Sequence, residues 1–167
     1  SLSFKVYDHT SGNIYTCFES LQFENDATIG LPDQPYELNV DLDIDQSMNL
    51  GEAWNWISFN VHPADTSIAA VFGPLTPHVY QVKNQSQSVT YYQNIPIWLG
   101  DLEHITDGES YLVYMNQEFN DFIVSGVPIP SSSPISLTAN WNWIAYYPQE
   151  VFDLDTALAS LIPNVIQ

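Results

Sequence analysis

The chain has 167 residues, of which 45% are hydrophobic, which suits a compact domain with a substantial core. Twenty acidic side chains face two lysines and no arginine, and the formal net charge is -18. Binding to nucleic acid needs basic side chains against the phosphates, so the charge excludes that class and disfavours anionic lipid surfaces. No segment reaches the roughly 18 consecutive apolar residues of a membrane span, so membrane insertion is not expected.

Short segments of alternating polar and apolar residues recur along the chain and predict β-strands. A turn signal follows the first of them and predicts a hairpin, and a second turn is expected at residues 32–35. In chain order these strands cover residues 3–7, 14–18, 38–45, 88–92, 111–114 and 121–124. Two short helical patterns, each begun by an aspartate suited to capping, cover residues 65–72 and 153–161. The predicted fold class is all-β: a sandwich or barrel-like pair of sheets with two short helices.

An internal repeat is centred on the sequence Trp-Asn-Trp-Ile. Residues 48–59 align with residues 135–146 at a constant offset of 87 positions. In each copy a proline and a helical pattern follow, and a weaker match of His78-Val79-Tyr80-Gln81 to Asn164-Val165-Ile166-Gln167 comes next. The repeat divides the chain into an N-terminal part (1–46), a first unit (47–133) and a shorter second unit (134–167), expected to form one compact domain. Because the second unit is cut short, we expect the chain to be a fragment of a longer protein.

The first copy resembles a known kind of segment. Gln46-Ser47-Met48-Asn49-Leu50-Gly51-Glu52-Ala53-Trp54-Asn55-Trp56-Ile57-Ser58 is similar to the Q-x-I-x-L-x-x-G-W-N-W-I/F-S segments of bacterial extracellular and cell-surface proteins, common in large multidomain proteins exported by Bacteroidetes-like bacteria. Phe4-Lys5-Val6-Tyr7-Asp8, and Ile29-Gly30 followed by Pro35-Tyr36, resemble the stretch that precedes such segments, so the likeness covers most of the chain. It implies an extracellular or cell-surface location and carries no activity. In those bacterial segments glycine usually precedes Trp-Asn-Trp, whereas this chain has Ala53 and Asn140 at that position. A turn with positive φ is therefore in doubt at Ala53, while asparagine tolerates one.

The five tryptophans are the candidate ligand-binding residues. On a strand, Trp54 and Trp56 share one face and Asn55 takes the other, and the same holds for the second copy. Exposed indoles would be platforms for sugar rings, whereas buried indoles would anchor a sandwich core. The duplication favours the core interpretation for the motif tryptophans, and leaves Trp98 as the better candidate for a partly exposed platform. The candidate set is Trp54, Trp56, Trp98, Trp141 and Trp143.

A metal site is the second candidate. Residues 41–52 place oxygen ligands at positions 1, 3, 5, 7, 9 and 12, the spacing of an EF-hand calcium loop. Gln46 stands where that loop needs glycine, no helices flank it, and the alternation predicts a strand with one acidic face instead. Mutual repulsion of Asp41, Asp43 and Asp45 on that face would still be relieved by a divalent cation, so Ca²⁺ stays open as a ligand.

Catalysis has little support in the sequence. The four histidines lack metal-binding spacing, no nucleophile elbow or phosphate loop is present, and the lone Cys17 fits a small buried hydrophobe. We therefore expect a non-catalytic structural or interaction module on a bacterial cell surface: an adhesin, filament or scaffold. Its partners would be other protein modules or neighbouring chains that pair with an open sheet edge. The alternative is a carbohydrate-binding module for extracellular polysaccharide, supported by Ca²⁺.

Overall fold

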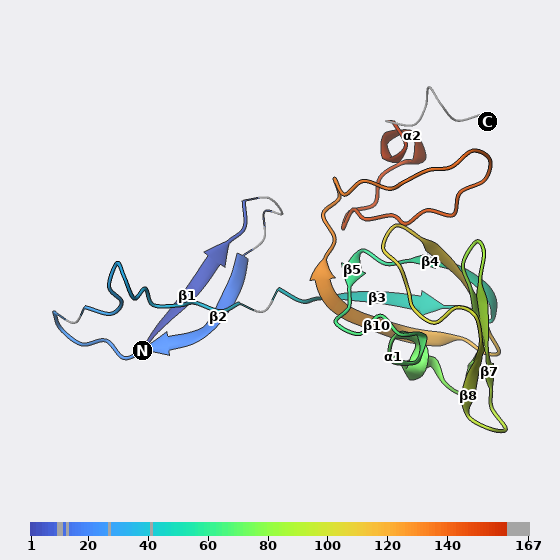
Figure 1. Cartoon of the computed structure of the whole chain (residues 1–167), viewed down its shortest axis with the longest axis horizontal. Coiled ribbons are helices and arrows are strands. Elements are labelled where there is room, and N and C mark those ends of the chain that lie inside the picture. The colour runs from blue at the N-terminus through green and yellow to red at the C-terminus, as the bar shows by residue number, and fades with distance from the viewer. Residues whose placement is uncertain (10–11, 13, 27, 41, 160–167) are drawn as a thin grey trace.

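The computed structural model describes residues 1–9, 12, 14–26, 28–40 and 42–159. It confirms a β-rich fold built as a sandwich of two open sheets with a separate N-terminal hairpin (Figure 1). The hairpin has the strands β1 (Leu2–Tyr7) and β2 (Ile14–Leu21). One sheet of the sandwich has the order β3-β10-β5, with β3 at Ile44–Leu50, β10 at Phe119–Pro128 and β5 at Val61–His62.

The other sheet of the sandwich has five strands in the order β4-β9-β6-β7-β8, all antiparallel. Their bounds are Ala53–Ser58 for β4, Ser110–Met115 for β9, Val79–Lys83 for β6, Ser88–Tyr92 for β7 and Ile97–Gly100 for β8. The chain passes from one sheet to the other through the turn at Gly51–Glu52, between β3 and β4.

The core lies between the two sheets because alternate strand residues point inward. In β9 the inward positions are Tyr111, Val113 and Met115, all fully buried. From the opposite sheet, Phe122 stacks on Phe72 of helix α1 (Ile68–Phe72), with ring centroids 6.0 Å apart. A 3-10 turn, η1 (Gly73–Leu75), continues this helix.

Helix α1 was predicted to begin at Asp65, and it begins later. Its N-cap is Ser67, whose hydroxyl accepts the backbone N–H of Ala70, while the Asp65 carboxylate accepts the N–H of Ser67. Helix α2 (Leu154–Ala157) has the expected Asp153 cap. Residues 160–167, which include the echo Asn164–Gln167, lie outside the described part of the chain.

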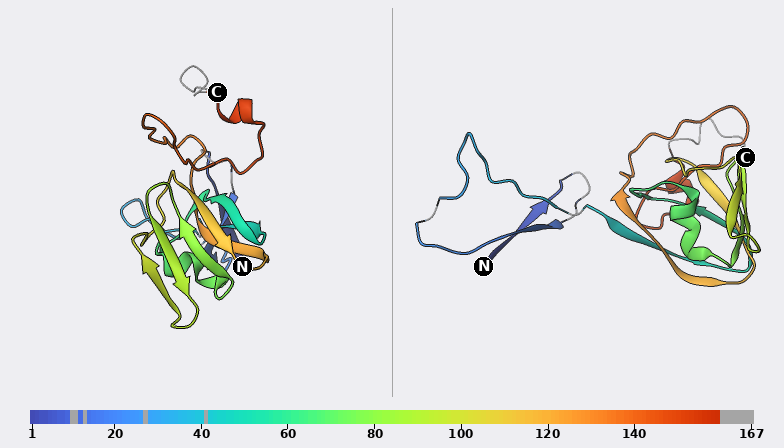
Figure 2. Two further views of the ribbon diagram at one scale, coloured as in Figure 1. Left: turned by 90° about the vertical axis from the view of Figure 1, so that its right-hand side faces the viewer. Right: turned by 60° about the horizontal axis from the view of Figure 1, so that its bottom comes forward.

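The N-terminal hairpin lies apart from the sandwich, joined to it by the segment before β3 (Figures 1 and 2). Both predicted strands of the hairpin are confirmed, and Cys17 is buried as expected. The strand predicted over residues 38–45 forms only at its end, where β3 begins at Ile44; among the described residues before it, Val40 makes an isolated bridge to Cys17. Instead of a continued ladder, Asn39 donates its backbone and side-chain N–H groups to the Glu19 carboxylate, and these bonds lower the pKa of Glu19.

The turn into each Trp-Asn-Trp segment has positive φ. The angle is 71° at Ala53 and 78° at Asn140, so the turn doubted at Ala53 does form. Left-handed backbone costs a non-glycine residue about 1–2 kcal/mol, and asparagine less than most. The turn is therefore formed in spite of the alanine, and other contacts must hold it.

We expect Ala53→Gly to raise the free energy of unfolding by about 0.5–1 kcal/mol, because relief of the left-handed strain outweighs the extra freedom of unfolded glycine. Urea denaturation followed by circular dichroism measures the change. Ala69→Gly is the matched control: Ala69 is an exposed helical residue, so this variant should lose up to about 1 kcal/mol. Destabilisation by both variants would contradict the strain at Ala53.

Candidate functional site

The asparagine of each Trp-Asn-Trp motif clamps the turn before it. The Asn55 side chain accepts the backbone N–H of Gly51 at 2.8 Å and donates to the carbonyls of Gly51 and Ala53 at 2.8 and 3.1 Å. Asn142 makes the same bonds in the second copy, to the N–H and carbonyl of Thr138 and to the carbonyl of Asn140. The repeat seen in the sequence is thus a repeated local structure, in which one amide closes a turn of positive φ.

The motif tryptophans point away from the core. Trp54 is 45% exposed, Trp56 60% and Trp141 87%, so the core interpretation is wrong for these three. Trp98 is half-buried, packs on the core and lies 5.1 Å from the Tyr91 ring, so it is partly exposed as predicted, although Trp54, Trp56 and Trp141 are the more exposed indoles. The reason is register: Trp54 and Trp56 pair with Tyr114 and Leu112 on the solvent side of β9, and Ile57 pairs with buried Tyr111.

The second motif docks on the first unit without forming a full strand. Its only ladder contact in the described chain is the bridge Ile144–Glu109, made by Ser110 N–H to the Trp143 carbonyl and Ala145 N–H to the Gly108 carbonyl. Half-buried Trp143 packs edge-to-face against Trp56, with centroids 4.5 Å apart and planes at 66°.

Gln85 completes this docking site by forming hydrogen bonds with the backbone of the second motif. Its side-chain amide donates to the Trp141 carbonyl and accepts the Trp143 N–H, both at 2.8 Å. Asn84 holds the turn that presents Gln85: it is buried, accepts two backbone N–H groups of that turn, and donates to Glu109 at 2.8 Å. Nothing in the pattern of residues 84–87 signals this role, because it depends on a partner 56 residues away in sequence.

The loop before β9, on which the second motif docks, is held in place by the buried side chain of Tyr111. The Thr106 backbone N–H donates to the Tyr111 hydroxyl at 2.7 Å, and burial raises the pKa of that hydroxyl. Burial also raises the pKa of Tyr147, with a further contribution from the negative charge of Asp107. Both hydroxyls therefore stay protonated and act as uncharged hydrogen-bonding groups near neutral pH.

The solvent side of the five-stranded sheet forms a continuous surface that we call the aromatic face. It consists of the solvent-accessible outward positions of the five strands, with Tyr80 at the register shift in β6: Trp54, Trp56, Ser58, Tyr80, Gln81, Lys83, Ser88, Thr90, Tyr92, Ile97, Leu99, Leu112 and Tyr114. None of the five strands contains an aspartate or glutamate, although the chain has twenty. The face is thus neutral apart from one lysine, on a molecule whose net charge is strongly negative.

The rings of the aromatic face meet edge to face rather than lying flat. Tyr114 stands between Trp54 and Tyr80, with centroids 5.1 and 5.8 Å away and planes at 78° and 77°. The Lys83 ammonium lies over the Trp54 ring, 4.5 Å from its centroid, and makes a cation–π contact. These contacts hold the rings in place, and they leave a ridged surface instead of a row of coplanar platforms.

The acidic candidates within the described residues do not form a calcium loop. Residues 44–50 are the strand β3, whose side chains alternate between two faces and so cannot surround one ion. Gln46 is used elsewhere, donating to the Ser58 carbonyl and accepting the Asn60 N–H, and Asp45 accepts the Ser125 hydroxyl. Asp41 lies outside the described residues. Across the described ranges, no three His, Cys, Asp or Glu side chains gather to hold a metal, Asp43 included.

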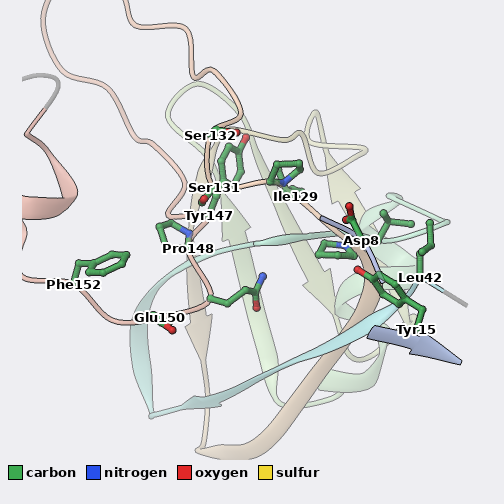
Figure 3. A pocket seen from close by; sticks show the side chains of 14 residues that line it. Asp8, Tyr15, Leu42, Ile129, Ser131, Ser132, Tyr147, Pro148, Glu150 and Phe152 are labelled. Carbon is green, nitrogen blue, oxygen red and sulfur yellow. The ribbon is translucent and has the colours of Figure 1, made fainter. Parts of the chain in front are cut away.

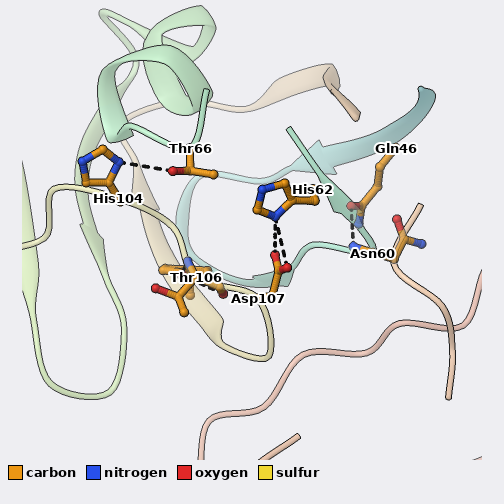
Figure 4. A network of polar contacts seen from close by, with 8 residues as sticks. Gln46, Asn60, His62, Thr66, His104, Thr106 and Asp107 are labelled. Atoms are coloured by element: carbon orange, nitrogen blue, oxygen red, sulfur yellow. Dashed lines mark hydrogen bonds and ion pairs between the residues drawn. The ribbon is translucent and has the colours of Figure 1, made fainter. Parts of the chain in front are cut away.

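Two histidine contacts join β5 and the segment after it to the loop before β9 (Figure 4). His62 Nδ1 is 3.0 Å from both carboxylate oxygens of Asp107, and both side chains are about half exposed. His104 Nδ1 is 3.2 Å from the Thr66 hydroxyl. These contacts link β5 and the segment before helix α1 to the loop before β9. Their geometry is that of surface contacts that stabilise a loop.

A cleft of about 480 Å³ opens between the N-terminal part and the sandwich (Figure 3). Its walls combine aromatic rings and prolines with two carboxylates, a mixture that suits an uncharged or cationic group. It is lined by Asp8, Tyr15, Leu42, residues 127–132, residues 147–150 and Phe152.

No protein-family model matches this chain, and no curated protein or solved structure matches it significantly. Among the described residues, no helix has the length and apolar character needed to cross a bilayer.

We expect Asn55→Ala to lower the free energy of unfolding by about 1–3 kcal/mol, because it leaves the Gly51 and Ala53 backbone groups without their partner. Asn142→Ala is the matched control: it removes the same bonds from a segment outside the sheets, so the loss should stay below about 0.5 kcal/mol. Urea denaturation measures both changes. Equal losses in the free energy of unfolding would contradict the view that the Asn55 clamp supports the sandwich whereas the Asn142 clamp lies on its surface.

Proposed function

We propose that this chain is a non-catalytic structural or interaction module of a bacterial extracellular or cell-surface protein, such as an adhesin, filament or scaffold, and that the aromatic face is its contact surface. The observation that carries the proposal is the exposure of Trp54 and Trp56 on a face free of carboxylates. Large exposed apolar patches are rare on soluble proteins and mark interaction sites. Tryptophan and tyrosine are also the residues enriched where interfaces gain most of their energy.

Electrostatics supports the same surface. Two acidic molecules repel each other over most of their area, and a neutral face is where close approach costs least. The strands of the opposite layer differ, since β3 contains Asp45 and β10 contains Asp121. The extracellular location rests on the resemblance of residues 46–58 to exported bacterial segments and on the acidic composition.

The absence of a catalytic role is part of the proposal. The histidine–carboxylate pair of His62 and Asp107 is half exposed and lies outside the 480 Å³ cleft. A general acid or base is expected inside a concave site, where burial and a partner tune its pKa.

A carbohydrate-binding module is the second candidate, and one observation favours it. Exposed indoles of β4 share one face of the sheet with the hydroxyl and amide groups of Thr90, Ser88 and Gln81, a combination that suits a neutral polysaccharide. The perpendicular rings, and the lysine that covers Trp54, fit sugar stacking less well than they fit packing against protein.

Beads coated with the chain test the proposal when mixed with further chain-coated beads or with beads carrying neutral polysaccharides. We expect chain-to-chain adhesion, and we expect Trp54→Ala with Trp56→Ala to abolish it because the variant removes the two most exposed indoles of the aromatic face. Val151→Ala with Leu154→Ala is the matched control, since both residues are exposed elsewhere, and should adhere normally.

Adhesion only to polysaccharide, lost in the same tryptophan variant, would replace the first candidate with the second. Equal adhesion by the tryptophan variant and its control, or none by the wild type, would contradict the aromatic face as a contact surface.

A further inference from the structure

Strand β4 is a sheet edge that is open at Trp54 and Trp56, whereas the carbonyl of Ser58 at its end accepts the Gln46 side chain. It lies at the end of the order β4-β9-β6-β7-β8 and pairs with β9 over six consecutive residues without a register shift. Its sequence, Ala-Trp-Asn-Trp-Ile-Ser, contains no charge and no proline. Natural proteins usually guard such edges with charges, prolines, bulges or short strands, because the free backbone groups pair readily with another chain.

The other edges carry such guards. Strand β8, at the far end of the same sheet, has four residues and follows Pro96. Strand β3 carries Asp45, and β5 has two residues. In the hairpin, β1 contains Lys5 and a register shift beside it.

Alternation along β9 shows which groups of β4 face outward. Asn116, next after β9, donates its N–H to His78 on the β6 side, so even-numbered residues of β9 bond toward β6 and odd-numbered ones toward β4. Residues 53, 55 and 57 of β4 pair with these odd positions. The backbone N–H and C=O groups of Trp54 and Trp56 are therefore directed away from the sheet, and the described chain supplies no backbone partner for them.

We propose that a second copy of this chain adds its own β4 antiparallel to this edge. The pairing is isologous, with Asn55 opposite Asn55 about a two-fold axis, so that Trp54 of each copy exchanges two hydrogen bonds with Trp56 of the other. The two five-stranded sheets become one, and the aromatic faces join into a single surface. The inference rests on the proposed role of this face in interaction and names its partner.

One observation points to a second copy rather than to an unrelated strand. In the proposed register each Trp54 stands beside the opposing Trp56, and indoles of this motif already pack edge to face within one chain, where Trp56 meets Trp143 at 4.5 Å. Charge sets the condition for this contact: each copy carries -18, and β4 lies in the sheet whose strands have no carboxylates, where close approach of two copies costs least. Because long-range repulsion opposes the contact, added salt should strengthen it.

Sedimentation velocity from micromolar to millimolar protein, at low and high salt, tests the pairing in the intact chain. We expect a monomer–dimer equilibrium that salt shifts toward dimer. Trp54→Lys with Trp56→Lys sets like charges directly opposite, and we expect it to raise the dissociation constant about a hundredfold. Tyr92→Lys with Ile97→Lys, at exposed outward positions away from this edge, adds the same charge and should still dimerise.

Amide hydrogen exchange identifies the edge itself. In the dimer the backbone amides of Trp54 and Trp56 should exchange about tenfold or more slowly than in the monomer, whereas packing through side chains alone would leave them fast. A chain that stays monomeric at all concentrations and salts, a dimer that survives the two-lysine change at Trp54 and Trp56, or fast amides in the dimer would overturn the inference. Bead adhesion lost in the Trp54→Ala, Trp56→Ala variant, together with any of these results, would leave the proposed function standing.

Discussion

The Asn55 clamp is the constraint on which the rest of the sandwich depends. By bonding Gly51 and Ala53, one side-chain amide holds the turn that carries the chain from β3 in one sheet to β4 in the other. The turn sets which way β4 faces. With Ile57 turned inward, Trp54 and Trp56 must point to solvent, because side chains alternate along a strand. Three hydrogen bonds thus hold the turn from which pairing with β9 directs the largest apolar side chains of the motif to solvent.

The same motif serves two purposes in one chain. In the first copy its strand pairs fully with β9 and closes the core, while in the second it rests on the surface, held by Gln85 and by the bridge to Glu109. Both copies keep the clamp, so the local structure does not need a sheet around it. The aromatic face is the consequence: indoles from both copies meet on the neutral side of an otherwise acidic molecule, where they are available for contact.

Much of the fold could be predicted from alternation and repetition, since the hairpin and the strands 88–92 and 111–114 lie where those patterns place them, and each helix lies within its predicted segment but is shorter. Residues 38–45 show the limit, because their alternation is sound, but among the described residues before β3 only Val40 pairs, in a bridge to Cys17. The tryptophans show a second limit of prediction from the sequence. Alternation gives two faces and leaves open which one is buried, and that choice depends on pairing with β9 some 58 residues away, between Asn55 and Val113. Gln85 could not be predicted, because its amide contacts a distant backbone.

Acrylamide quenching of tryptophan fluorescence in dilute solution tests most directly the claim that the motif displays its indoles. The structure predicts strong quenching of the folded chain, and it predicts that Trp54→Phe, Trp56→Phe and Trp141→Phe together remove most of the quenchable emission, leaving the shielded signal of Trp98 and Trp143. Weak quenching of the wild type, or a quenching curve unchanged by the three substitutions, would place these indoles in the core and contradict the account.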